Sequence, residues 1–348
     1  MLFFHNDYSE GCHEKILQRL IHTNSEQTAG YGIDPYCQAA AVRIRSLCRN
    51  EDLGVHFLVG GTQANLTVID AALRPHQAAL CAESGHIHVH ETGAVEATGH
   101  KVLTVPSENG KLTARQVEAV IIGHREDESF EHMAQPKLVY ISNPTELGTI
   151  YTLEELERLS AVCREYGLYL FLDGARLGYG LTAKGNDVTL ADIARLCDVF
   201  YIGGTKVGAL FGEAVVIRNP AVNQDFRYLI KQHGGMLAKG RLLGIQFDTL
   251  LTEDLYFQIA ARANRMADRI RETLDKLGVN YLVPGVTNQI FPILSDAFLE
   301  ELGKNFTFTE MGRINENHRA VRLCTSWAST EQSVAMLCKE LENIAEII

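Results

Sequence analysis

Residues 199–206 read VFYIGGTK, an apolar run that ends in two glycines, a threonine and a lysine. A short apolar run bounded by glycines is typical of a strand that is buried on both faces. A lysine placed directly after such a strand is partly shielded from water, and desolvation lowers the pKa of an amine and makes it a better nucleophile. Lys206 is therefore a candidate nucleophile toward a carbonyl group. The alternative is a lysine on a loop tip that reaches back to solvent.

Apolar runs of the same kind recur through the middle of the chain. They lie at residues 55–59, 78–81, 101–105, 138–141, 169–172 and 214–217. Helical patterns separate most of them, and the helix predicted over residues 153–166 opens with Thr152 as its N-cap and Glu155 at the capping-box spacing. Strands alternating with helices predict an α/β fold, in which a mainly parallel sheet is covered by helices.

The pattern changes after about residue 252. A long amphipathic helix is predicted over residues 255–277, followed by strands near 288–293 and 320–325 and by a final helix from about residue 330. These elements predict a smaller α+β domain. The length of 348 residues favours one large and one small domain. We expect an N-terminal segment, 1–25, that packs with the small domain, a large domain, 26–245, and a small C-terminal domain, 246–348.

A second strand end carries charged residues. The strand predicted at residues 169–172 stops at Asp173, and Arg176 follows at the end of the sequence FLDGAR. A carboxylate at the end of a buried strand is costly unless it meets a cation or strong hydrogen-bond donors. A protonated ring nitrogen of a ligand is one such partner. The alternative is a structural ion pair between Asp173 and Arg176.

A third strand end is rich in glycine. The sequence GGTQAN, residues 60–65, joins the strand at 55–59 to a helical pattern. Glycines at such a turn let backbone N–H groups and the helix dipole face an anion, and Thr62 adds a hydroxyl next to Gly61. The alternative is an ordinary helix start. The spacing matches neither nucleotide-binding fingerprint, so nucleotide binding is not indicated.

Taken together, the three strand ends indicate one cofactor. Ligands of a parallel sheet bind at the carboxyl ends of its strands, where these residues would meet. Pyridoxal 5′-phosphate needs a cradle for its phosphate, a carboxylate for its ring nitrogen and an amine for its aldehyde. The sequence therefore predicts pyridoxal 5′-phosphate, with Lys206 holding it as a Schiff base.

The composition limits the partners. The chain has 43 acidic and 32 basic side chains, a formal net charge of −11, which argues against a nucleic-acid or anionic-membrane surface. No uncharged apolar run approaches the roughly 18 residues of a membrane span, and the first residues do not resemble a signal peptide. None of the 8 cysteines forms a CxxC pair. We expect buried, reduced thiols in a cytoplasmic protein.

The order of these motifs resembles that of a known family. GGTQAN at 60–65, HIHVHETGA at 86–94, FLDGAR at 171–176 and GGTK at 203–206 resemble the low-specificity L-threonine aldolases. That family belongs to the β-eliminating lyase group of fold-type-I pyridoxal-phosphate enzymes. The resemblance covers roughly residues 6–327. It implies a fold-type-I transferase-like architecture and a homodimer or homotetramer with the active site at the dimer interface.

The resemblance also implies roles around the cofactor ring. His86 would stack on the pyridine ring, and Asp173 would pair with the ring N–H group. Arg176 would approach the phenolic oxygen of the cofactor. Lys206 would form the Schiff base, which makes it the central residue of the site.

Further roles follow for the phosphate and the substrate. Gly61 and Thr62 would hold the phosphate, with Thr205 beside it. Arg322 matches the small-domain arginine that grips the substrate carboxylate, a task suited to a guanidinium group. Asn6 stands where the family has a serine near that carboxylate. Tyr31, in the sequence YGIDP, would face the active site across the dimer interface.

Two positions depart from the family pattern. The family has a Thr-His-Asn element where this chain reads NPTEL at 143–147, so the histidine is missing and Glu146 is the candidate in its place. The arginine that follows the Gly-Gly-Met turn in the family is Leu237 here, with Lys239 nearby. Both departures fall where the side chain of a substrate would lie.

The HIHVH run allows a second interpretation. If it were a strand, His86, His88 and His90 would point to one face and could bind a metal beside Glu91. Otherwise His88 and His90 are ordinary polar residues of a loop or a helix start, and we assign no metal site.

The activity that the resemblance implies is retro-aldol cleavage of an L-β-hydroxy-α-amino acid, similar to L-threonine or L-allo-threonine, to glycine and an aldehyde. Two residues are candidates for the base that takes the proton of the β-hydroxyl group: Glu146, and His86 acting through a water. One alternative keeps the fold and cofactor but carries out β-elimination, which releases pyruvate and ammonia. Two others are a metal-dependent hydrolase built on the HIHVH run and a binding protein without catalysis.

Overall fold

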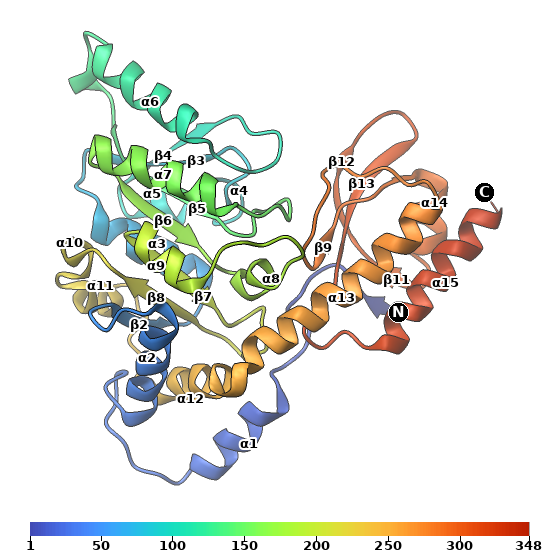
Figure 1. The fold of residues 1–348 in the computed structure, drawn as a ribbon, viewed down its shortest axis with the longest axis horizontal. Helices are drawn as coiled ribbons and strands as arrows, with labels where there is room; N and C mark the ends of the chain where they lie inside the picture. Colours follow the sequence, from blue (N-terminus) through green and yellow to red (C-terminus); the bar gives the residue numbers. More distant parts are fainter. Residues whose placement is uncertain (348) are drawn as a thin grey trace.

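The computed structural model describes residues 1–347, which contain two main sheets and a separate two-stranded pair (Figure 1). The larger sheet has seven strands in the described part of the chain. In spatial order these are β2 (Gly54–Leu58), β8 (Glu213–Ile217), β7 (Val199–Gly203), β6 (Tyr169–Asp173), β5 (Gln135–Ser142), β3 (Gln77–Ala82) and β4 (Lys101–Val105). Only β8 runs antiparallel to its neighbours in this sheet, so the predicted α/β fold with a mainly parallel sheet is confirmed.

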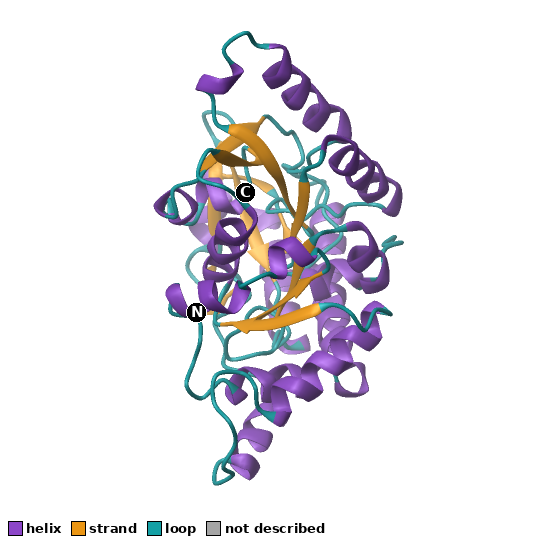
Figure 2. Cartoon of the chain, turned by 90° about the vertical axis from the view of Figure 1, so that its left-hand side faces the viewer, coloured by secondary structure: helices purple, strands orange, loops and turns teal. Residues whose placement is uncertain are grey.

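Both faces of the large sheet are buried, which explains the continuous apolar runs in the sequence. Along β7, Val199 and Tyr201 pack into one hydrophobic cluster, and Phe200 and Ile202 pack into another. Because successive side chains of a strand point to opposite faces, the two clusters are the two sides of the sheet. Figure 2 shows the strands lying between helices.

Helices cover the two faces unequally. The face of Tyr201 is covered by α3 (Gly61–Ala72), α5 (Ala94–Ala97), α10 (Pro220–Asn223) and α11 (Phe226–Gln232). The face of Phe200 is covered by α1 (Glu14–Thr23), α2 (Pro35–Cys48), α6 (Ala114–Glu126), α7 (Leu153–Tyr166), α8 (Leu177–Leu181), α9 (Leu190–Leu196), α12 (Arg241–Leu250) and α13 (Leu255–Lys276). Helix α7 has the predicted bounds, and the capping box of Thr152 and Glu155 is present. The short elements α4 (His86–Val89), η1 (Phe130–His132) and η2 (Thr252–Asp254) complete this part.

The smaller sheet lies toward the carboxyl end of the chain. It contains β10 (Ile293–Ser295), β13 (His318–Cys324) and β12 (Thr309–Arg313), and β9 (Gln289–Ile290) also pairs with β13. All these pairs are antiparallel. Helices α14 (Asp296–Leu302) and α15 (Glu331–Ile347) pack here, together with the far end of α13, which connects the two parts (Figure 1). The α+β character predicted for the carboxyl end is confirmed.

The N-terminal segment joins the two parts. Strand β1 (Leu2–Phe3) pairs in parallel with β11 (Phe306–Thr307), and the N-terminus lies in the same part of the molecule as the smaller sheet in Figure 1. Farther on, Arg19 of α1 and Arg43 of α2 each contact the buried Asp248 of α12 at 2.7 Å. The domain boundaries near residues 25 and 245 stay predictions.

The last two features of the described chain are the character of its helices and the state of its cysteines. Across residues 1–347, no helix has both the length and the apolar character that a bilayer crossing requires. The eight cysteines are free thiols. All are buried except Cys338, which is only partly buried, so the predicted core location is confirmed for seven of them.

Candidate active site

The carboxyl ends of several strands bring the predicted residues to one edge of the large sheet. Strand β6 ends at Asp173, and β7 ends shortly before Lys206. Strand β2 leads into α3, which begins at Gly61. Strand β5 ends at Ser142, a few residues before Glu146. Because all four strands point the same way, their ends converge as predicted.

Two adjoining cavities open at this edge. The inner cavity, about 280 Å³, is lined by the glycine turn 60–62, Asp173 and Thr205 among others. The outer cavity, about 660 Å³, is lined by residues of the N-terminal segment and of the smaller sheet, including Asn6 and Arg322. The side chains that line both cavities are Tyr8, His86, Glu146, Arg176 and Lys206. Two ligands can therefore meet beside Lys206.

Asp173 is the buried anion of the inner cavity, with 4% of its surface exposed. Its Oδ2 accepts hydrogen bonds from the Tyr140 hydroxyl at 2.6 Å and from Asn65 Nδ2 at 3.1 Å, and its Oδ1 accepts the Ala175 N–H at 2.9 Å. Burial acts to raise the pKa of Asp173, but the charge of His86 and these donors hold that pKa below its ordinary value. The carboxylate stays ionised and can pair with a cationic ring nitrogen.

His86 lies at the start of α4 and reaches the cavities from the end of β3. Its Nδ1 lies 2.7 Å from Oε1 of Glu91, which is 4% exposed. Asn65 Nδ2 donates to the same Glu91 oxygen at 2.7 Å and also to Asp173. Glu91 therefore fixes the orientation of the His86 ring. The stacking role of His86 stays a prediction.

The HIHVH run does not form the strand that a metal site would require. Residues His86–Val89 form the helix α4, and His90 is its C-cap. The rings of His86 and His90 lie one helical turn apart, with centroids 5.4 Å apart, whereas His88 is exposed. The premise of three histidines on one face of a strand is wrong. Among residues 1–347 there is no group of three side chains placed to hold a metal ion.

The backbone of Lys206 is fixed by a side chain of α8, one of the helices that cover the large sheet. The Tyr179 hydroxyl donates to the Lys206 carbonyl at 2.6 Å. Burial and the nearby charge of Arg176 lower the pKa of Lys206, although the carboxylates of Asp7 and Asp173 act in the opposite sense. A lowered pKa favours the neutral amine, which is the form that attacks a carbonyl group. The environment predicted for Lys206 from the sequence is present.

The N-terminus of α3 is open toward the inner cavity. Its N-cap, Gly60, has no side chain to occupy the first N–H groups of the helix, and Gly61 and Thr62 line the cavity. A Cβ atom on Gly61 would lie 3.2 Å from the Tyr201 hydroxyl, so a larger residue would crowd β7. Free N–H groups at a helix N-terminus suit a phosphate.

Arg176 does not pair with Asp173, contrary to the structural alternative considered for these residues. Its Nε and Nη2 donate to Oδ2 and Oδ1 of Asp7 at 2.7 and 3.0 Å. Asn288 Nδ2 also donates to Asp7, at 2.9 Å, and Asp7 is fully buried. Asp7 thus joins the N-terminal segment to both parts of the fold. Asp7 was not predicted from the sequence, although an acid directly after Asn6 was a usable signal.

Replacing Asp7 by asparagine is expected to lower the free energy of unfolding by about 3 kcal/mol, because Arg176 would keep a buried charge without its partner. The Asp7 charge also favours a protonated nitrogen on Lys206, so in the cofactor-loaded protein the pKa of the lysine imine should fall. Urea unfolding measures the first effect, and a spectral pH titration of the cofactor-loaded protein measures the second.

The matched control for this variant is Asp248→Asn, which removes another buried carboxylate, paired with Arg19 and Arg43, away from the cavities. It should lower stability without moving the spectral titration. An Asp7→Asn protein with the stability and titration of the parent would contradict the role given to Asp7.

Arg322, on β13, is the cation of the outer cavity. Its Nη2 donates to the His5 carbonyl at 2.9 Å and its Nη1 to Gln289 Oε1 at 3.4 Å. Its buried Nε has no hydrogen-bond partner within residues 1–347. A guanidinium group with unused donors beside a cavity suits a carboxylate. Asn6 lines the same cavity, and its Oδ1 accepts the Tyr8 N–H at 2.9 Å.

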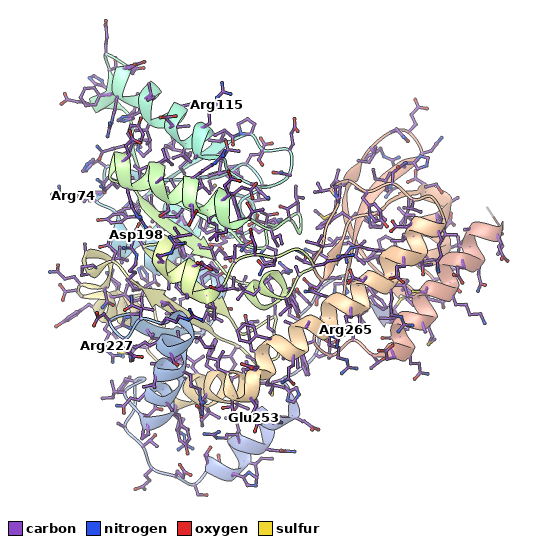
Figure 3. The ribbon with its side chains drawn as sticks, in the orientation of Figure 1. Arg74, Arg115, Asp198, Arg227, Glu253 and Arg265 are labelled. Atoms are coloured by element: carbon purple, nitrogen blue, oxygen red, sulfur yellow. The ribbon has the colours of Figure 1, made fainter. Side chains whose placement is uncertain are left out.

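Tyr31 does not join the other predicted residues within one chain. It is 47% exposed and lines a separate small cavity with Leu237, and Arg227, labelled in Figure 3, donates to its carbonyl at 3.0 Å. The Lys231 ammonium lies over its ring, 5.2 Å from the centroid. Its role across a dimer interface stays a prediction.

Glu146 occupies the position where the expected histidine is absent. Its Oε1 accepts the Ser142 hydroxyl at 2.6 Å and the His86 N–H at 3.0 Å. Burial raises the pKa of Glu146, and the Asp173 charge adds to this, although the Ser142 hydrogen bond lowers it. A carboxyl group with a raised pKa at the border of both cavities is suited to proton transfer.

These residues fit pyridoxal phosphate on structural grounds. The open helix N-terminus suits the phosphate, the ionised Asp173 suits a ring N–H group, and the amine of Lys206 suits the aldehyde. The fold and the site together define the class of the protein: an enzyme of fold type I, the architecture of pyridoxal-phosphate-dependent transferases and lyases.

Comparison with known proteins narrows this class. The family model described as beta-eliminating lyase matches residues 8–297, and this chain belongs to that family of pyridoxal-phosphate-dependent enzymes. A low-specificity L-threonine aldolase from a Pseudomonas species is 31% identical over 349 aligned positions, which cover 98% of this chain and 97% of the relative. A Saccharomyces cerevisiae protein of the same name is 28% identical over 70% of this chain and 62% of its own length.

Solved structures agree with this assignment. The structure of a Leishmania major threonine aldolase has a TM-score of 0.96 and 47% sequence identity, and the match covers 99% of this chain and 100% of the other. A Thermus thermophilus aspartate aminotransferase has a TM-score of 0.72 at 16% identity, over 99% of this chain and 91% of the other, and shares the fold. The fold-type-I architecture and the family expected from the sequence are confirmed.

Proposed function

We propose that this chain binds pyridoxal phosphate on Lys206 and cleaves L-β-hydroxy-α-amino acids of the L-threonine kind to glycine and an aldehyde. The observation that carries the proposal is the pair of adjoining cavities, in which Lys206 borders both a cofactor-sized space and a space lined by Arg322. The family and the names of its relatives support the reaction.

Each residue contributes a separate function. The bound cofactor would supply an aldehyde that bonds an amine and a protonated ring that accepts electrons. Asp173 holds the proton on the ring nitrogen. Arg322 binds the substrate carboxylate, and Asn6 lies beside it. Lys206 holds the cofactor at rest and gives up its place to the amino group of the substrate.

Glu146 is our choice for the base. It would take the proton from the β-hydroxyl group as the Cα–Cβ bond breaks and the carbon–oxygen single bond becomes the double bond of the leaving aldehyde. The electron pair that remains at Cα then takes up a proton, which gives glycine. His86 acting through a water is the other candidate, and because Glu91 contacts its Nδ1, only its Nε2 is left to take the proton. The raised pKa of Glu146 places its titration closer to neutrality, where a base is most effective.

A Glu146→Gln variant is expected to lower kcat by about 100-fold or more, the usual size of a general-base contribution. The parent should lose activity as pH falls through the raised pKa of Glu146, because the base must be ionised. The variant should lack that acidic limb. Steady-state rates of aldehyde release across pH measure both effects.

Ser142→Ala gives the matched control for Glu146→Gln. The Ser142 hydroxyl stabilises the ionised carboxylate, so its removal should raise the pKa of Glu146 and move the acidic limb to higher pH while turnover continues. An unchanged pH profile in both variants would rule out Glu146 and leave His86 as the base.

The reaction itself is tested by product analysis with L-threonine. The proposal requires glycine and acetaldehyde in equal amounts. A 2-oxo acid and ammonia as the main products would instead establish β-elimination. The relatives named threonine aldolases do not favour this alternative, and the helical geometry of the HIHVH run does not favour the metal-dependent hydrolase.

We further infer a homo-oligomer in the cytoplasm. A dimer would bring Tyr31 of one subunit to the active site of the other, which accounts for an exposed aromatic side chain in a backbone conformation with a φ of 61°. The eight free thiols suit a reducing compartment. Sedimentation analysis of the parent and of Tyr31→Ala, with activity measured in parallel, tests the role of Tyr31.

A further inference from the structure

Glu213 is a buried carboxyl group at the inner cavity whose role the reaction leaves open. It begins β8, is 3% exposed and lines the cavity together with the glycine turn 60–62. In the sheet it lies opposite Leu58, the last residue of β2, so it sits beside the chain that leads into α3. Next to a phosphate, an ionised carboxylate would be repelled.

Hydrogen bonds tie Glu213 to the turn that carries the lysine. Its Oε1 lies 2.9 Å from Thr205 Oγ, and its Oε2 accepts the Gly204 N–H at 3.1 Å. Thr205 Oγ also accepts the Gly212 N–H at 3.0 Å. A hydroxyl group has one proton to donate and two lone pairs that accept. These contacts therefore limit where the Thr205 proton can point.

Two proton arrangements satisfy the same contacts. If Glu213 is ionised, Thr205 donates its only proton to Glu213, and no proton remains for a ligand. If Oε1 of Glu213 carries a proton, Glu213 donates to Thr205, whose two lone pairs then serve Glu213 and Gly212. The Thr205 proton is then free to turn into the cavity. The direction of this one hydrogen bond decides whether Thr205 can donate to an anion.

We propose that Glu213 is a positioning residue that carries a proton while the cofactor is bound, and that this proton directs the Thr205 hydroxyl toward the phosphate. The inference rests on the proposed cofactor and deepens it by naming the group that controls retention of the phosphate. Loss of the proton withdraws the Thr205 donor and places a second negative charge beside the phosphate.

The surroundings of Glu213 place this change in an accessible pH range. Burial raises the pKa of Glu213 to about 8, although the Thr205 hydrogen bond and the Lys206 charge act to lower it. The other titratable groups that face it are Asp173 on β6, Tyr201 on β7 and Tyr256 on α13. The pKa of Asp173 is lowered and the pKa values of Tyr201 and Tyr256 are raised. Asp173 therefore stays ionised and both tyrosines stay neutral while Glu213 titrates.

The test follows the release of cofactor from the holoenzyme by dilution and ultrafiltration at about pH 6.5 and about pH 9.5, on either side of the Glu213 pKa. The parent should release cofactor about tenfold faster at the higher pH, the effect of losing one charge-assisted hydrogen bond. In Glu213→Gln, the amide donates to Thr205 at every pH, so release should depend much less on pH. The Glu213 charge also acts on Lys206, so Glu213→Gln changes both groups, and variants of Thr205 that keep Glu213 are needed to separate the hydroxyl from the lysine.

Thr205 supplies two further variants. Thr205→Ser keeps the hydroxyl and should follow the parent, whereas Thr205→Val lacks it and should release cofactor quickly at both pH values. The proposal is overturned if Glu213→Gln shows the full pH dependence of the parent. It is equally overturned if Thr205→Val retains cofactor like Thr205→Ser at the lower pH, and this comparison stands even if Glu213→Gln does not fold. A parent chain that binds no pyridoxal phosphate would overturn the proposed function as well.

Discussion

Replacing Asp173 by asparagine is expected to lower kcat by roughly two to four orders of magnitude. Breaking a buried ion pair costs about 3–5 kcal/mol, and each 1.4 kcal/mol is about tenfold in rate. The asparagine amide has the shape of the carboxylate but no charge, so it cannot hold the proton on a ring nitrogen. Its amide group would also face the Tyr140 hydroxyl and the Asn65 amide, which both donate to Asp173.

Steady-state rates at saturating cofactor and the absorbance of the bound cofactor measure this effect together. Tyr140→Phe is the matched control, because it removes one donor to Asp173 and keeps the carboxylate. It should cost about tenfold or less, in line with a single hydrogen bond to a charged group. An Asp173→Asn protein that binds cofactor normally and keeps full turnover would show that the carboxylate is not needed to charge the ring.

Replacing Lys206 by alanine is expected to reduce turnover to the background rate and to abolish covalent attachment of the cofactor. The physical reason is that the amine both fixes the aldehyde and leaves it ready for exchange with the amino group of a substrate. Other contacts, at the open N-terminus of α3 and at Asp173, would still allow noncovalent binding. Turnover assays and mass spectrometry of the intact protein measure the two losses.

Two lysine variants sharpen this prediction. Lys206→Arg keeps a positive charge but offers no amine that forms a Schiff base, so it should be as inactive as Lys206→Ala. Lys137→Ala removes a lysine that lies over the Tyr169 ring, away from both cavities, and should leave turnover unchanged. Substantial activity in Lys206→Arg would mean that charge, rather than the amine, is what the site uses at this position.

Much of the large sheet and of the cofactor site could be predicted from the sequence because the signals there are local. A strand buried on both faces reads as an apolar run, and the polar residue that follows it lies at the carboxyl edge of the sheet. This logic led to Asp173 and Lys206 without knowledge of any contact. The order of the strands in the sheet brings these two residues together, and this order could not be predicted from the sequence.

The residues that the sequence analysis missed depend on contacts between distant segments. Asp7 lies at the start of the chain, just after β1, which pairs with the distant strand β11, and it meets Arg176 far along the sequence. Glu213 stands just before the apolar run at 214–217 and has no signal of its own in the sequence, and its role follows from its contact with Thr205. Neither contact leaves a periodic pattern in the sequence.

Two other sequence interpretations failed for local reasons. The HIHVH run was considered as a strand because its polar and apolar residues alternate, but it follows the end of β3 and forms a short helix at the sheet edge. Strand β12 was not predicted, because its residues Thr309–Arg313 are mostly exposed and lack an apolar pattern. Alternation alone is thus a weak guide in segments this short.

The most direct test of the account is an absorbance spectrum of the purified protein before and after borohydride reduction, followed by peptide mapping. We expect a band near roughly 420 nm, typical of a protonated lysine imine of pyridoxal phosphate. Reduction should remove the band and leave the cofactor attached to the peptide that contains Lys206. A protein that stays colourless and fails to bind added pyridoxal phosphate, or a label on any other lysine, would contradict the central role of Lys206.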